Sequence, residues 1–98
     1  MKEIRILFDS FLLDKVVSEI KEFGIERYLV ISKIKGEWRS DLKHFDNHVW
    51  PGTDSMVMII VNDEGAKEIM ESIRMIKEDV GERISMGAIL SPIEDLIF

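Results

Sequence analysis

Two histidines and two aspartates lie close together in one short segment of the chain, as Asp41, His44, Asp46 and His48. Because His44, Asp46 and His48 alternate, their side chains would point to the same side of an extended segment. Imidazole and carboxylate groups together suit zinc, copper or nickel. The spacing therefore predicts a divalent-metal site. The competing interpretation is a solvated polar loop in which the two histidines fall together by chance.

The segment that contains these residues, 36–49, has no sustained apolar period, which indicates an exposed loop or a hairpin extension. Trp38 lies near its start, and tryptophan is enriched at binding hot spots. Basic and acidic side chains balance between residues 35 and 50, whereas the whole chain has a formal net charge of −6. Such a neutral arm can approach an acidic partner that the rest of the chain would repel. We therefore predict that Trp38, Arg39 and Lys43 bind a partner protein.

The composition restricts the classes of function. A chain of 98 residues with 46% hydrophobic residues predicts one folded domain, residues 1–98. Nineteen acidic residues against thirteen basic ones repel the backbone of a nucleic acid. The chain has no cysteine, no apolar run long enough to span a membrane and no secretory leader pattern. These features predict a cytoplasmic protein that neither binds nucleic acid nor inserts into a membrane.

No group of residues predicts catalysis. Ser32, Ser40 and Ser85 have no identifiable base, and a hydroxyl without a base is a poor nucleophile. Neither a paired-carboxylate site nor a thiol nucleophile can be argued from the sequence. We therefore expect a protein that is not an enzyme.

The elements that must position these residues follow from the hydrophobic periodicity. Alternating apolar residues and β-branched runs predict strands, whereas spacings of three and four predict helices that end at glycines. The predicted strands cover residues 4–8, 28–35, 56–61 and 87–90, and the predicted helices cover 13–23 and 62–80. The order βαββαβ predicts an α+β ferredoxin-like sandwich, with an antiparallel sheet and both helices on one of its faces.

The second face of that sheet also needs a cover. The run at 56–61, MVMIIV, is apolar on both sides, and the chain ends in the apolar residues Leu96, Ile97 and Phe98. Exposed apolar surface of this extent is typical of an interface. We therefore predict that the second face packs against further copies of this chain.

Several stretches resemble the PII-like superfamily, small trimeric regulators that include the nitrogen-regulatory P-II proteins. The resemblance is carried by the opening MKEIRILFDSFLLDKVVSEIKEFGI, by KIKG, by MVMIIV followed by NDE, and by AILSPIEDLI. It implies a homotrimer with adenine nucleotides such as ATP, ADP or AMP in clefts between subunits. It also implies that residues 36–49 form the T-loop, which docks on a regulated transporter or enzyme, and that residues 80–87 form the B-loop, which closes on phosphates.

The resemblance further implies five effector-binding residues, which are Gly36, Glu37, Gly81, Arg83 and Gly87. A phosphate cradle needs free backbone N–H groups and a cation, and Arg83 would supply that charge. The sequence departs from the family pattern at Gly87, where the family has a lysine, and the residues after strand four contain no basic side chain.

These observations favour a trimeric, non-catalytic regulator whose effector shifts the 36–49 loop between conformations. Two alternatives stay open. The first is a metal-binding trimer similar to the CutA proteins, using His44, Asp46 and His48. The second is a small-molecule-binding module of the ACT type, which has the same order of elements but leaves the long loop unexplained.

Overall fold

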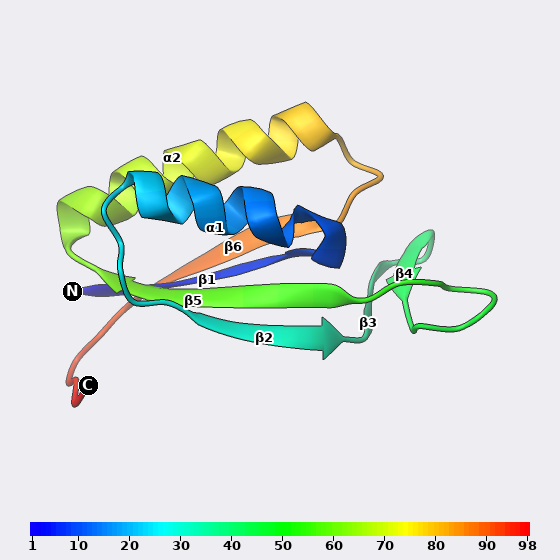
Figure 1. Cartoon of the computed structure of the whole chain (residues 1–98), viewed down its shortest axis with the longest axis horizontal. Coiled ribbons are helices and arrows are strands. Elements are labelled where there is room, and N and C mark those ends of the chain that lie inside the picture. Colours follow the sequence, from blue (N-terminus) through cyan, green and yellow to red (C-terminus); the bar gives the residue numbers. More distant parts are fainter.

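The chain folds into a four-stranded antiparallel sheet with both helices on one face and a small hairpin beyond one end (Figure 1). This computed structural model describes all residues from 1 to 98. In chain order, the elements are β1 (Lys2–Asp9), the 3-10 turn η1 (Ser10–Leu12), α1 (Leu13–Glu22), β2 (Leu29–Ile34), β3 (Gly36–Arg39), β4 (Leu42–His44), β5 (Asp54–Val61), α2 (Asp63–Val80) and β6 (Met86–Pro92). The predicted α+β ferredoxin-like sandwich is confirmed.

The core lies between the helices and one face of the sheet, whose strands run in the order β2-β5-β1-β6. Alternate residues of β1, which are Ile4, Ile6 and Phe8, are buried beneath the helices. In the register of the sheet, Ile4 lies opposite Ile59 of β5, so both strands present their buried residues to the same side. This period-2 pattern is the one that the sequence shows in both segments.

Local signals set the ends of the helices. The side chain of Asn62 accepts a hydrogen bond of 2.7 Å from the backbone N–H of Gly65 and thereby caps α2. Gly24 has φ of +79° and follows α1, where a left-handed residue allows the chain to leave the helix. Asp9 caps the 3-10 turn rather than α1, because its carboxylate accepts from the N–H of Phe11.

Replacing Asn62 with alanine is expected to lower the free energy of unfolding by about 1 kcal/mol, because an N–H at the start of α2 loses its acceptor. Urea denaturation followed by circular dichroism measures the change. Asn62→Asp keeps an acceptor at the same place and is the matched control. An Asn62→Ala protein as stable as Asn62→Asp would contradict a stabilising role for this cap.

The helices leave the opposite face of the sheet uncovered, and apolar side chains from all four strands share it. We call this surface the open face; its apolar residues are Leu7, Leu29, Ile31, Met56, Met58, Ile60 and Ile89, and the ion pair of Glu3 and Arg5 lies on the same side. Ile31 is 51% exposed, and Leu29 and Ile89 are exposed to a similar extent. The predicted second apolar face is therefore present; no helix covers it, and of the apolar tail only Leu96 and Phe98 come beside it, near Leu29 and Met58.

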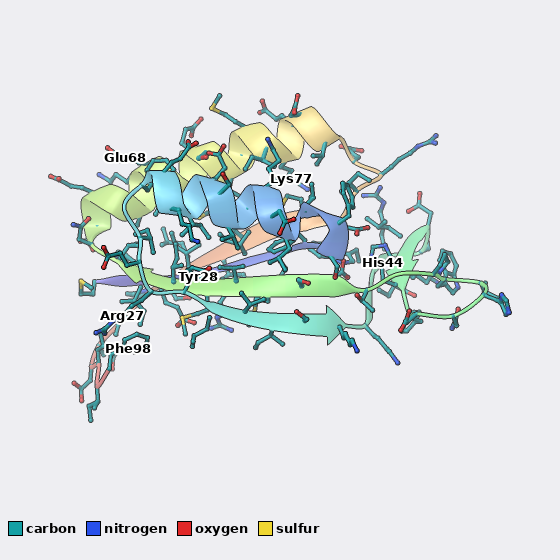
Figure 2. All side chains as sticks on the ribbon, viewed as in Figure 1. Arg27, Tyr28, His44, Glu68, Lys77 and Phe98 are labelled. Carbon is teal, nitrogen blue, oxygen red and sulfur yellow. The ribbon has the colours of Figure 1, made fainter.

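The segment 36–49, predicted as an exposed loop or a hairpin extension, is a hairpin followed by a loop. Residues 36–44 form the hairpin β3–β4, in which Gly36 pairs with His44 and Glu37 with Lys43. Figure 1 shows this hairpin beyond the ends of β2 and β5, at the opposite end of the molecule from both chain termini. Figure 2 shows His44 at the hairpin end and Arg27 beside Phe98 at the other end. None of the helices combines the length and apolar character needed to cross a membrane.

Candidate functional site

A buried carboxylate joins the hairpin to the main sheet. Asp54, the first residue of β5, is only 2% exposed. Its Oδ2 accepts a hydrogen bond of 2.8 Å from the indole Nε1 of Trp38, and its Oδ1 accepts one of 2.6 Å from the hydroxyl of Ser85. The Nδ1 of His44 lies 2.9 Å from the same Oδ1. We call Asp54, Trp38, His44 and Ser85 the Asp54 cluster; it ties the two strands of the hairpin to β5 and to the segment before β6.

His44 also lies between two carboxylates. Asp9 and Asp54 are directly opposite each other in the register of β1 and β5, an arrangement in which two negative charges repel. The Nδ1 of His44 faces Asp54, and its Nε2 lies 3.4 Å from Oδ2 of Asp9. His44 therefore bridges the two acids, and its buried ring is part of the structure at the base of the hairpin.

The predicted partner-binding residues hold the hairpin together. Trp38 is anchored to Asp54, as described above. The guanidinium of Arg39 pairs with Asp41 and donates to the backbone carbonyl of Glu82, in the segment between α2 and β6. The ammonium of Lys43 lies 3.1 Å from the carboxylate of Glu37 and 4.8 Å from the centre of the Trp50 ring. All three side chains thus have partners within the chain.

A groove of about 510 Å³ opens between the hairpin and β6. We call it the hairpin groove; it is lined by Leu7, Ile34, Gly36, Glu37, Trp38, Asp54, Gly87, Ala88 and Ile89. Leu7 and Ile89 also belong to the open face of the sheet. The groove is therefore continuous with the open face, so a neighbouring subunit packed on that face would border it.

The hairpin groove collects three of the five predicted effector-binding residues, Gly36, Glu37 and Gly87. Gly81 lies elsewhere, in a polar depression beside Arg74 and Lys77 at the end of α2. Arg83 is exposed and lines neither of these two sites. Within one chain, Gly36, Glu37 and Gly87 thus lie together. The guanidinium of Arg83, which was predicted to supply the positive charge, does not line the same groove.

The predicted metal ligands are not brought together. His44 is turned inward to Asp9 and Asp54, while Asp46 and His48 are exposed on the loop that follows β4. No group of three or more histidine, cysteine, aspartate or glutamate side chains is arranged to hold a metal ion. The alternation of these residues does not put them on one side, because β4 ends at His44 and Asp46 has φ of +55° instead of an extended conformation.

Two members of the Asp54 cluster were missed in the sequence analysis. Both are buried: Asp54 contacts Trp38 and His44 of the hairpin from β5, and Ser85 contacts Asp54 from the segment before β6. One signal could have drawn attention to Asp54, since it is a charged residue at the start of a strand whose last six residues, 56–61, are all apolar. Its partners are between ten and thirty-one positions away in the sequence, so spacing could not have identified them.

Comparisons with known proteins give a class and then a family. The structure aligns with a crystal structure from Thermus thermophilus that is described as a putative PII-like signalling protein. The TM-score is 0.68 at 22% identity, and the alignment covers 92% of this chain and 83% of that one. The architecture is therefore that of PII-like proteins. The family model for the nitrogen regulatory protein P-II matches residues 1–97. The chain therefore belongs to the nitrogen regulatory protein P-II family.

Two further structures come from Thiomonas intermedia K12, whose protein CPII is described as a nitrogen regulatory PII-like protein. CPII bound to ADP and bicarbonate aligns with a TM-score of 0.67, over 92% of this chain and 86% of that one, at 14% identity. The apo form aligns with a TM-score of 0.64, over 92% of this chain and 89% of that one, at 12% identity. No curated protein matches this chain in sequence.

These comparisons confirm the resemblance to PII-like proteins and the fold that it implies. Among the families that have this order of elements, P-II is the one whose model matches this chain. At these identities, the likeness to solved structures concerns the fold alone. The effector, the partner and the site residues are therefore matters for proposal.

Proposed function

We propose that this chain is a trimeric, non-catalytic signalling protein of the P-II type, which binds a small effector in the hairpin groove at the boundary between subunits. Through the segment 36–49 it then controls a partner transporter or enzyme in the cytoplasm. The observation that carries this proposal is the position of the hairpin groove, which lies at the base of the hairpin and at the edge of the open face.

Assembly through the open face supports an effector site shared by two subunits. The exposed apolar side chains of β2, Leu29 and Ile31, form part of a surface that no element of the chain covers. Burying such a surface against sister subunits is favourable by about 25 cal/mol for each Å² removed from water. A subunit seated there would come next to Leu7 and Ile89 and would close the open side of the hairpin groove.

Adenine nucleotides are the effectors that we propose for the groove. CPII structures with ADP, AMP and bicarbonate are among the solved structures that resemble this chain. Gly36 and Gly87 leave the backbone accessible in the groove, and Glu37 places a carboxylate acceptor at its rim. Gly81 and Arg83 lie outside the groove, so this proposal assigns them no contact with the ligand.

The Asp54 cluster offers a route from the groove to the hairpin. Trp38 and Asp54 line the groove, and Asp54 also contacts His44 of β4 at the base of the hairpin. An effector that changes the position of Trp38 therefore changes the contacts of both hairpin strands. Beyond β4, Phe45 and Val49 are exposed apolar side chains, which we propose as contacts for the partner together with Trp38.

Thermal denaturation with ATP, ADP, AMP and inorganic phosphate, alongside light scattering, tests the proposal. An effector at one hundred times its dissociation constant stabilises the folded protein by about 2.7 kcal/mol, which should raise the melting temperature by several degrees. We expect a rise with at least one nucleotide and the mass of three chains.

Two variants localise the effect. Gly36→Val adds a side chain to the groove, and its Cβ meets no atom within 4 Å, so the fold should tolerate it. Ser40→Val places the same side chain at the tip of the hairpin, outside the groove, and is the matched control. We expect the nucleotide-induced rise to shrink only in Gly36→Val. A trimer that shows no rise with any nucleotide would remove adenine nucleotides as effectors.

A further inference from the structure

Trp38 contributes an anchored indole ring to the lining of the hairpin groove. Its side chain is 38% exposed and lines the groove, although its indole N–H is bound to the buried carboxylate of Asp54 at 2.8 Å. Asp54 is itself held by Ser85 and His44. A side chain anchored in this way loses little conformational freedom when a ligand contacts it, which favours binding.

The position of the indole depends on glycine at the facing site. A Cβ added to Gly87 would lie 3.4 Å from Cζ3 of Trp38 and 3.8 Å from Cη2, so the six-membered ring lies directly against this glycine. A long side chain at position 87 would have to displace the ring. The pair Trp38 and Gly87 thus fills one wall of the groove with an aromatic surface.

The charges of the groove lining are equally informative. No lysine, arginine or histidine is among its residues, and the two that are ionisable, Glu37 and Asp54, are acids. Lys43 approaches Glu37, but its ammonium is engaged by that carboxylate and by the Trp50 ring. Within one chain, a phosphate bound in the groove would contact acidic and apolar groups, which do not favour its negative charge. A flat, uncharged ring would contact the indole of Trp38 and apolar side chains.

We infer that Trp38 is the specificity-determining residue of the hairpin groove, and that it selects ligands by stacking on an uncharged planar ring such as adenine, with little contribution from phosphates. Glu37 accepts a hydrogen bond from an amino group on the edge of that ring. This inference rests on the proposed function, since it names the ligand class of the same groove.

Adenosine, AMP, ADP and ATP, titrated by calorimetry, test the inference. We expect the dissociation constant of adenosine to lie within about threefold of that of ATP. Replacing the aromatic side chain on which a base stacks typically weakens binding by about tenfold or more. Trp38→Leu should therefore weaken adenosine binding by about tenfold. Trp38→Phe keeps an aromatic ring and should restore most of the affinity.

Fluorescence reports directly on contact with the indole, because the chain contains two tryptophans, Trp38 and Trp50. In Trp50→Phe, Trp38 is the sole tryptophan and the Asp54 cluster is intact, so this variant tests the inference even if Trp38→Leu is poorly folded. We expect saturating adenosine to change the emission of Trp50→Phe and to leave that of Trp38→Phe, which reports on Trp50, unchanged.

The outcomes separate this inference from the proposed function. ATP binding more than tenfold tighter than adenosine, or an unchanged Trp38 emission at saturation, overturns the role of Trp38 while adenine nucleotides stand as effectors. If none of the four compounds binds, the proposed adenine effector fails and the ligand class inferred here fails with it.

Discussion

Asp54→Ala is expected to lower the free energy of unfolding by about 3 to 5 kcal/mol, because three donors lose their acceptor at once. Trp38, His44 and Ser85 all direct a polar atom at the carboxylate of Asp54, and His44 and Ser85 are buried with it. Buried donors left without a partner are among the few mechanisms that produce destabilisation of this size. Urea denaturation monitored by circular dichroism measures the loss.

The matched control is Asp79→Ala, since Asp79 is an exposed aspartate near the end of α2. We expect Asp79→Ala to change stability by at most about 0.5 kcal/mol, as exposed substitutions usually do. Amide hydrogen exchange adds a local measurement, in which Asp54→Ala should lower the protection of residues 36–44 more than that of β1. Equal stabilities of the two alanine variants would show that the Asp54 cluster does not hold the hairpin.

Ile31→Lys is expected to reduce the molecular mass in solution from that of three chains to that of one. Ile31 lies on the open face, where it is 51% exposed in a single chain. If sister subunits cover that face, the substitution buries an unpaired ammonium group, which costs far more than an apolar contact gains. Light scattering coupled to size-exclusion chromatography measures the mass.

Met75→Lys is the matched control for this substitution, because Met75 is a large apolar residue that is 64% exposed on the outer side of α2. We expect Met75→Lys to keep the mass of the unmodified protein. Circular dichroism of both variants shows whether each chain is folded. A folded Ile31→Lys protein with the mass of three chains would mean that the subunits assemble through another surface. A single-chain mass for the unmodified protein would refute assembly itself.

The main sheet and the helices could be predicted because their signals are local. The alternation of Ile4, Ile6 and Phe8 is visible in a window of five residues, and it requires a strand with one buried face whatever lies opposite. The cap at Asn62 and the positive φ of Gly24 follow equally from neighbouring residues. The structure extends β1 and β6 by one or more residues at each end, where strand pairing rather than sequence sets the limit.

The candidate site could be predicted only in part. Gly36, Glu37 and Gly87 do line one groove, although they were assigned to it by family resemblance and not from spacing. The metal-site interpretation treated His44 as a member of an extended polar segment. In the structure His44 pairs with Gly36 across the hairpin, and this pairing turns its ring to Asp9 and Asp54.

The sequence by itself determined the order of the elements, the acidic surface and the presence of two apolar sheet faces, since each depends on residue types within a few positions of one another. Only the tertiary structure decided what the polar residues of the hairpin do. The partners of Trp38 and His44 are set by the register of β3 against β4 and by the meeting of β1, β5 and β6, which are distant in the sequence. The buried carboxylate of Asp54 binds the hydrogen-bond donors that the packing of these strands brings close to it. The spacing of residues along the sequence does not reveal which donors these are.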